Sequence, residues 1–205
     1  MWKTLFGKKK TDKEIEKMKE QSESGDYKFY PILKPGDWVG IQAGALKQTL
    51  IGTQEEPQVV VGFGYDTPEN FIFLTHQDLE KMDGNQILND AYQNLEDFKT
   101  EFEPVGSLDN KVLTSSGLDF SSERILSKNH MLEAHKMLDA EELLVSIARR
   151  RCMMVTSRAA DDELLNTFIM LHNETWNDDS YGNAPIANML FVVKEGDIVG
   201  SIPLQ

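Results

Sequence analysis

The sequence predicts an α+β fold with a mainly antiparallel sheet and helices packed on one face. Two apolar runs around a charged turn at residues 143–157 have the pattern of a β-hairpin. Residues 58–65 and 70–74 have the composition of further strands, and residues 85–102 carry an apolar stripe at helical spacing. The order of strands, helices, hairpin, helix and second hairpin favours antiparallel pairing.

The most strongly patterned stretch is LLVSIARRRCMMVTS, residues 143–157. Its two apolar arms are separated by Arg149, Arg150 and Arg151. Two buried strands that meet at a charged turn account for this pattern. We therefore expect a hairpin in the middle of the sheet.

The chain before this hairpin is expected to form strands and then helices. Residues 38–42 and 48–51 have the character of short strands, and residues 70–74 are expected to lie antiparallel to 58–65. The helix at 85–102 is expected to bury one stripe of side chains: Leu88, Ala91, Leu95, Phe98 and Phe102. A second helical region should run from Ser121 or Ser122 to Leu138, with a break near Asn129.

The chain after the hairpin predicts one helix and a second hairpin. Asp161, Asp162 and Glu163 favour a helix N-terminus, and the helix continues on an apolar face to Trp176. Residues 188–194 and 197–202 are separated by Glu195 and Gly196, which suit a two-residue hairpin turn.

Length and composition predict a single globular domain preceded by a basic segment. The chain has 205 residues with 40% hydrophobic content, enough for one core. Residues 1–26 are expected to form a basic N-terminal segment with a short charged helix and a linker. Residues 27–205 are expected to form one α+β domain.

The charge and the terminal sequence restrict the partners. The formal net charge of −13 opposes binding to nucleic acid, because phosphates would be repelled, and suits a basic protein partner. No apolar run approaches the length of a membrane span and residues 1–10 lack a signal-peptide core, so we expect a cytoplasmic protein. Trp2, Leu5 and Phe6 lie among lysines, a pattern that also allows contact with an anionic membrane surface.

The sequence contains no recognisable catalytic or metal-binding motif. The histidines, His76, His130, His135 and His172, lack paired ligand spacing, and no serine has the context of a nucleophile. The lone Cys152 excludes an intrachain disulfide and is expected to be an inert, buried thiol. We expect no cofactor and no metal, and we favour a protein that is not an enzyme.

The candidate binding residues are the arginines of the turn. Arg149, Arg150 and Arg151 must meet water, carboxylates of this chain, or an anion from outside. Arg158, and also Arg124, are placed to join them in holding a phosphate or a partner carboxylate. Pairing with the protein's own carboxylates is the other interpretation.

Two stretches, residues 58–98 and 141–193, resemble the YtpQ-like family of bacterial proteins. The resemblance rests on QVVVGFGYDTPENFIFL, on DAYQNLEDF with Ala91, Asn94 and Leu95, and on LLVSIARRRCMMVTSR followed by a long helix. Where that family tends to carry proline or an Arg-Asp pair in the turn, this chain has Ala148 and three arginines. The resemblance implies an α+β bacterial cytoplasmic protein and supplies no activity.

Two functions are compatible with the sequence. The first is a non-catalytic cytoplasmic protein-binding module, such as an acidic inhibitor or immunity-type protein for a basic partner. The alternative is a small enzyme acting on a phosphorylated or carboxylated small molecule. In that case the arginine turn would hold the anion, and His135 or His172 would transfer a proton.

Overall fold

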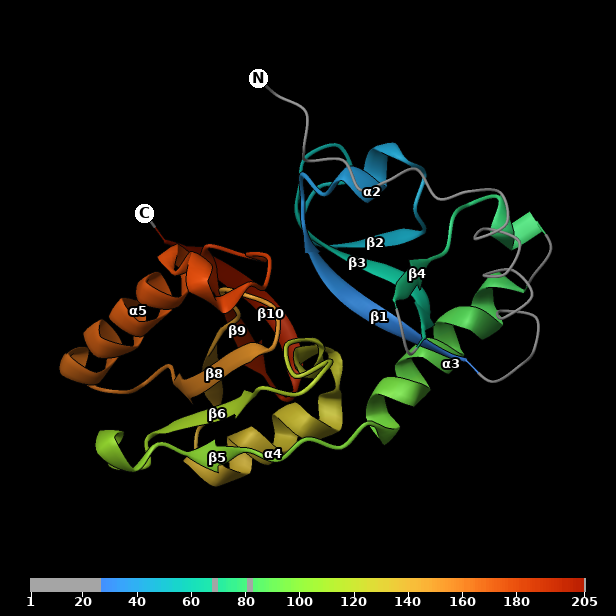
Figure 1. Cartoon of the computed structure of the whole chain (residues 1–205). Helices are drawn as coiled ribbons and strands as arrows, with labels where there is room; N and C mark the ends of the chain where they lie inside the picture. Colours follow the sequence, from blue (N-terminus) through green and yellow to red (C-terminus); the bar gives the residue numbers. More distant parts are fainter. Residues whose placement is uncertain (1–26, 68–69, 81–82, 205) are drawn as a thin grey trace, which may run out of the picture.

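The computed structural model describes residues 27–67, 70–80 and 83–204 (Figure 1). Its strands form two antiparallel sheets, and helices pack around them. The predicted α+β class with mainly antiparallel pairing is confirmed. The predictions for the basic segment, including Trp2, Leu5 and Phe6, lie outside the described residues.

The first sheet is built around one long strand. The strand β3 (Pro57–Asp66) is buried from residue 59 to 65 and pairs on one side with β1 (Lys28–Pro35). On its other side it pairs with β2 (Lys47–Gly52) and then with β4 (Phe71–Phe73). The predicted strands at 48–51, 58–65 and 70–74 are therefore confirmed.

The sequence pattern missed β1 and misjudged the segment that follows it. β1 contains Pro31 and Pro35, which punctuate loops more often than strands. The strand lies at the edge of its sheet, where the missing N–H of a proline is tolerated. The strand predicted at 38–42 is wrong, because Val39–Gln42 form the short helix α2 and Val39 is 74% exposed.

The second sheet has six strands in the order β10-β9-β7-β8-β6-β5. The predicted hairpin forms its two central strands and is confirmed. The bounds are β5 (Glu103–Pro104), β6 (Val112–Ser116), β7 (Glu142–Ser146), β8 (Cys152–Ser157), β9 (Met189–Lys194) and β10 (Asp197–Pro203).

The alternation of side chains along β7 and β8 gives this sheet two buried faces. Val145 and Met153 belong to the larger core, which also contains Met131 of α4 (Lys128–Leu138) and Val61 of the first sheet. Leu144 and its neighbours face α5 (Asp162–Asn177) and form a second core. A helix thus covers each face of the six-stranded sheet.

The start of α5 agrees with the prediction, whereas the end of α3 (Gly84–Asp97) and the start of α4 differ from it. Asp161 accepts a hydrogen bond from Leu164 N at the start of α5, as its acidic first turn predicts. The helix α3 ends before the predicted residue 102, with Phe98 at its C-cap. The second helical region breaks at Ser127, which caps α4, rather than near Asn129. Short 3-10 turns complete the chain: η1 (Asp78–Glu80), η2 (Gly106–Leu108), η3 (Glu123–Leu126) and η4 (Asp179–Tyr181).

The second predicted hairpin is also confirmed. Glu195 and Gly196, with φ of 51° and 81°, connect β9 to β10. Among the described helices none has the length and apolar character required to cross a membrane.

Candidate functional site

The β7–β8 turn sends its three arginines to three different places. Arg149 is 4% exposed and closes the C-terminal end of α5. Its guanidinium donates to the backbone oxygens of Thr175 (2.8 Å), Trp176 (2.7 Å) and Asn183 (2.8 Å). It also reaches Asp179 Oδ1 at 2.8 Å. Arg149 therefore satisfies carbonyls that the helix leaves unpaired.

Arg150 acts electrostatically on ionisable groups of β1 and η3. Its charge acts on Glu123, which is fully buried and accepts a hydrogen bond from Leu33 N at 3.1 Å. Burial raises the pKa of Glu123, while Arg150 and Lys34 act in the opposite direction. Glu123 Oε2 and Arg150 Nε are buried without a hydrogen-bond partner among the described residues. Arg150 thus interacts electrostatically with a carboxylate of its own chain.

Arg151 adopts a left-handed backbone conformation, with φ of 65°, and turns its side chain toward Asp119. Arg151 Nε donates to Asp119 Oδ1 at 2.8 Å, and Nη2 donates to the same oxygen. The arginine side chain remains 41% exposed. Of the candidate arginines, it is the one that lines a pocket.

Arg158 and Arg124 do not join the turn. Arg158 follows the last residue of β8, so it lies at the opposite end of the hairpin from the turn. It donates to Glu142 Oε2 at 2.7 Å. Arg124 is buried and donates to the backbone oxygen of Leu95. The structure therefore does not assemble the arginine cluster that the sequence suggested.

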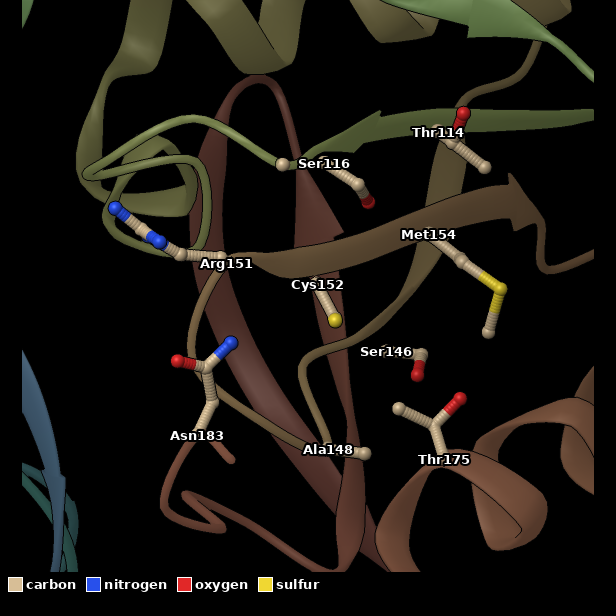
Figure 2. Close-up of a pocket in the computed structure, with 10 residues that line it drawn as sticks. Thr114, Ser116, Ser146, Ala148, Arg151, Cys152, Met154, Thr175 and Asn183 are labelled. Atoms are coloured by element: carbon tan, nitrogen blue, oxygen red, sulfur yellow. The ribbon is translucent and has the colours of Figure 1, made fainter. Parts of the chain in front are cut away.

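The pocket has a volume of about 530 Å³ and lies between the six-stranded sheet and the C-terminal part of α5. Figure 2 shows Arg151 and Asn183 on one side, Ser146 and Thr175 on the other, and Cys152 between them. Arg151 is the only charged residue in its wall. The lining residues are Thr114, Ser116, Gly117, Ser146, Ala148, Arg151, Cys152, Met154, Thr175 and Asn183.

The pocket forms where both the sheet and α5 change from apolar to polar. Leu164 and Phe168 fill the space between α5 and the sheet near Leu144 and Val192. One helical turn after Phe168 comes His172, and the face then continues to Thr175. The strands carry small polar residues at the same level, since Ser146 pairs with Met154 and Ser116 pairs with Cys152. Small polar side chains leave the volume that leucine and phenylalanine fill elsewhere.

The back of the pocket contains a hydrogen bond between Ser146 and His172. Ser146 Oγ lies 2.8 Å from His172 Nδ1, and the histidine is fully buried behind the serine. Burial lowers the pKa of His172, and the Asn188 side chain acts in the opposite direction. The imidazole is therefore neutral at pH 7.

The sequence pattern did not identify this pair. Ser146 and His172 are 26 residues apart, and neither lies in a known motif. One signal was present, because Ser146 interrupts the apolar run LLVSI where a buried strand would carry another apolar residue.

Cys152 differs in part from its prediction. It is half-buried in the pocket wall rather than enclosed in the core. Burial raises the pKa of its thiol, which leaves little thiolate at pH 7. The expectation of low intrinsic reactivity is consistent with this environment.

The other histidines lie elsewhere. His130 stacks on Phe102 with ring centroids 4.0 Å apart, and burial lowers its pKa to about 3. His135 Nδ1 lies 2.7 Å from Ala140 O at the end of α4. Within residues 27–67, 70–80 and 83–204, no group of three or more His, Cys, Asp and Glu side chains is placed to hold a metal ion.

Comparison of the chain with protein families, with curated proteins and with solved structures gives no match. The resemblance to the YtpQ-like family stays a prediction. The arguments about function therefore rest on the geometry of the chain itself.

Proposed function

We propose that the protein binds a small anionic molecule in the pocket between the six-stranded sheet and α5. One observation carries this proposal. Among the described residues that line the pocket there is one guanidinium and no carboxylate, in a protein whose formal net charge is −13. Arg151 is paired with Asp119, but Asp119 does not line the pocket, so an anion there would meet the guanidinium and not the carboxylate.

The remaining polar groups of the wall suit the same ligand. The hydroxyl groups of Thr114, Ser116, Ser146 and Thr175 and the amide of Asn183 can hydrogen-bond an oxygen-rich molecule. Asp119 fixes Arg151 through Nε and Nη2. Nη1 has no hydrogen-bond partner in the part of the chain that the structure describes, so it is the donor left for a ligand.

Calorimetric titration with inorganic phosphate and with succinate tests this proposal. We expect Arg151→Gln to weaken the tighter of the two anions by about 10-fold, the value of one charge-assisted hydrogen bond. Arg158→Gln is the matched control, because it removes the same charge at a site outside the pocket. Binding that is absent from the wild type, or equal in all three proteins, would contradict the proposal.

The position of the anion can be checked with Cys152, whose thiol lies in the pocket wall. A bound anion is expected to slow the alkylation of Cys152 by iodoacetamide. In Arg151→Gln, the anion should slow the alkylation of Cys152 only at about 10-fold higher concentration. An alkylation rate that ignores the anion in the wild type would place the binding site elsewhere.

We also propose a second function, recognition of a basic protein through α5, because a specific observation favours it. Residues 159–193 contain no lysine or arginine, and the exposed positions of α5 include Asp162, Glu163 and Glu174. The helix lies on the outside of the molecule (Figure 1). Acidic residues exposed on a helix without basic neighbours in sequence attract a basic partner by electrostatic steering.

Affinity purification from native lysate at low and high salt tests the second function. We expect a stoichiometric complex at about 50 mM salt that weakens at about 300 mM. The complex should be lost from a triple variant with Asp162→Asn, Glu163→Gln and Glu174→Gln. A partner retained equally by that variant would not bind through α5. Both functions are proposed for the cytoplasm.

A further inference from the structure

Beside the hydrogen bond between Ser146 and His172 lies a third polar side chain, that of Asn188, which acts on the histidine. Asn188 precedes β9, and its Nδ2 donates to Leu204 O at 3.3 Å. The amide oxygen Oδ1 is therefore free to face the histidine, and Asn188 acts on His172 through its side chain. His172 Nε2 and Asn188 Oδ1 are both buried, and neither has a hydrogen-bond partner among the described residues.

The side chain of Asn188 favours one tautomer of His172. An amide oxygen only accepts hydrogen bonds, so it favours the neutral ring in which Nε2 carries the proton. Nδ1 is then unprotonated and accepts the hydrogen bond from Ser146 Oγ. A serine hydroxyl that donates to a fixed, unprotonated imidazole nitrogen has the relationship of a nucleophile to its base.

The serine lies at the wall of the pocket. Ser146 is among the lining residues although it is only 2% exposed, and His172 is fully buried. Ser116 provides a contrast in the same wall, because its Oγ exchanges hydrogen bonds with the backbone of Met153 and meets no base. Two serines thus line one pocket, and one of them has a histidine partner.

We propose that Ser146 is the nucleophile of an acyl-transfer site, with His172 as its base and Asn188 as a positioning residue. The substrate class is a small ester with an anionic group, so this inference rests on the proposed anion site. Ser146 Oγ forms a bond to the carbonyl carbon while its proton passes to His172 Nδ1. The C–O bond to the alcohol breaks, and the alcohol takes the proton from His172. Water, activated by the same nitrogen, then releases the carboxylic acid and restores the serine.

Labelling with phenylmethylsulfonyl fluoride tests the nucleophile without any need for the natural substrate. Ser146 Oγ attacks sulfur, fluoride leaves and the proton passes to His172. We expect one adduct by intact-mass spectrometry, located on Ser146 by peptide mapping. Ser146→Ala should prevent the adduct, and Ser201→Ala, at a serine of β10 outside the pocket, should label at the wild-type rate. His172→Gln should slow labelling by about 100-fold, the range of general-base assistance.

Asn188→Asp supplies a further test, because its expected result, faster labelling, cannot be caused by a loss of folding. A carboxylate at this position stabilises the imidazolium formed during attack, so we expect this variant to label faster than the wild type. Asn188→Leu also loses the hydrogen bond to Leu204 O, so its folding is checked by circular dichroism, and the folded variant should label more slowly. A folded wild type and a folded Asn188→Asp that both leave Ser146 unmodified would overturn the proposal.

The two proposals fail separately. The sulfonyl fluoride is uncharged and does not require Arg151, whereas the anion titration does not require Ser146 to react. Labelling of Ser146 without anion binding would overturn the proposed ligand class and support the nucleophile. Anion binding with no labelling would support the ligand site and overturn the nucleophile.

Discussion

At the scale of single residues, the three adjacent arginines have the same charge and three different environments. Arg149 is buried at the end of α5, Arg150 interacts electrostatically with Glu123, and Arg151 remains half exposed at the pocket. The left-handed backbone at Arg151 turns the chain back into β8. Similar side chains therefore have separate consequences for stability and for binding.

Replacement of Arg149 should be strongly destabilising. Arg149→Met leaves the carbonyls of Thr175, Trp176 and Asn183 without their donor in a buried place. We expect the free energy of unfolding to fall by about 2–4 kcal/mol, measured by urea denaturation. Asp179→Asn is the control and should cost less than about 0.5 kcal/mol, since Asp179 is 97% exposed. Equal losses of unfolding free energy in both variants would show that the ion pair with Asp179, rather than the hydrogen bonds to the carbonyls, stabilises the fold.

The buried Glu123 should make stability depend on pH. Its pKa is raised in the folded protein, mainly by burial, so the folded state holds a proton that the unfolded chain has lost. Stability therefore falls as pH rises from the unfolded value of about 4.5 through the raised folded pKa. Glu123→Gln keeps an acceptor for Leu33 N and has no proton to lose.

The measurement is urea denaturation of both proteins between pH 4 and pH 8. We expect the stability of Glu123→Gln relative to wild type to increase with pH across this range. The other titrating groups are common to both proteins, so the difference isolates Glu123. A difference that stays constant with pH would mean that Arg150 and Lys34 balance the burial of the carboxylate.

At the scale of elements, α5 and the β9–β10 hairpin show how local sequence directs packing. The first half of α5 presents Leu164 and Phe168 to the sheet, and its last turns present His172 and Thr175. One helix therefore supplies both a core and one wall of a pocket. The hairpin instead depends on one position where only glycine fits.

Gly196→Ala should destabilise the hairpin, whereas Gly200→Ala should not. Gly196 has φ of +81°, and a Cβ there would lie 2.9 Å from Lys128 O. We expect a loss of at least about 1 kcal/mol from the strained backbone alone. A Cβ at Gly200 would meet nothing within 4 Å, so that substitution should be neutral. Similar melting temperatures for both variants would argue against the turn geometry.

At the scale of the whole molecule, the two sheets share one hydrophobic core. Leu33, Val61 and Phe63 of the first sheet belong to the same cluster as Val145 and Met153 of the second. Such continuity is expected to make unfolding cooperative. The two sheets should therefore behave as one domain.

The tryptophans provide a direct test of cooperativity. Trp38 lies at the first sheet, where it packs on Phe73, and Trp176 lies near the end of α5. One variant, Trp2→Phe with Trp176→Phe, keeps Trp38, and a second, Trp2→Phe with Trp38→Phe, keeps Trp176. For each variant we expect the midpoint of unfolding measured by fluorescence to equal the midpoint measured by circular dichroism. If the first sheet unfolded separately, the fluorescence and circular dichroism midpoints would differ in at least one of the two variants.

Much of the fold was predictable because its signals are local. Periodicity located both hairpins, and caps such as Asp161 located the start of α5. The prediction failed at β1, because two prolines mark a loop unless the strand is known to be an edge. It also failed at residues 38–42, where apolar side chains form α2 rather than the predicted strand.

The sequence by itself determined the α+β class, the antiparallel hairpins and the acidic charge, since these depend on residue type and short-range spacing. Tertiary structure alone decided which arginine lines a pocket and which closes a helix. It also brought Ser146 against His172, because strand register and helix position unite residues that are far apart in the chain. Such contacts depend on packing in three dimensions, which leaves no periodic trace in the sequence.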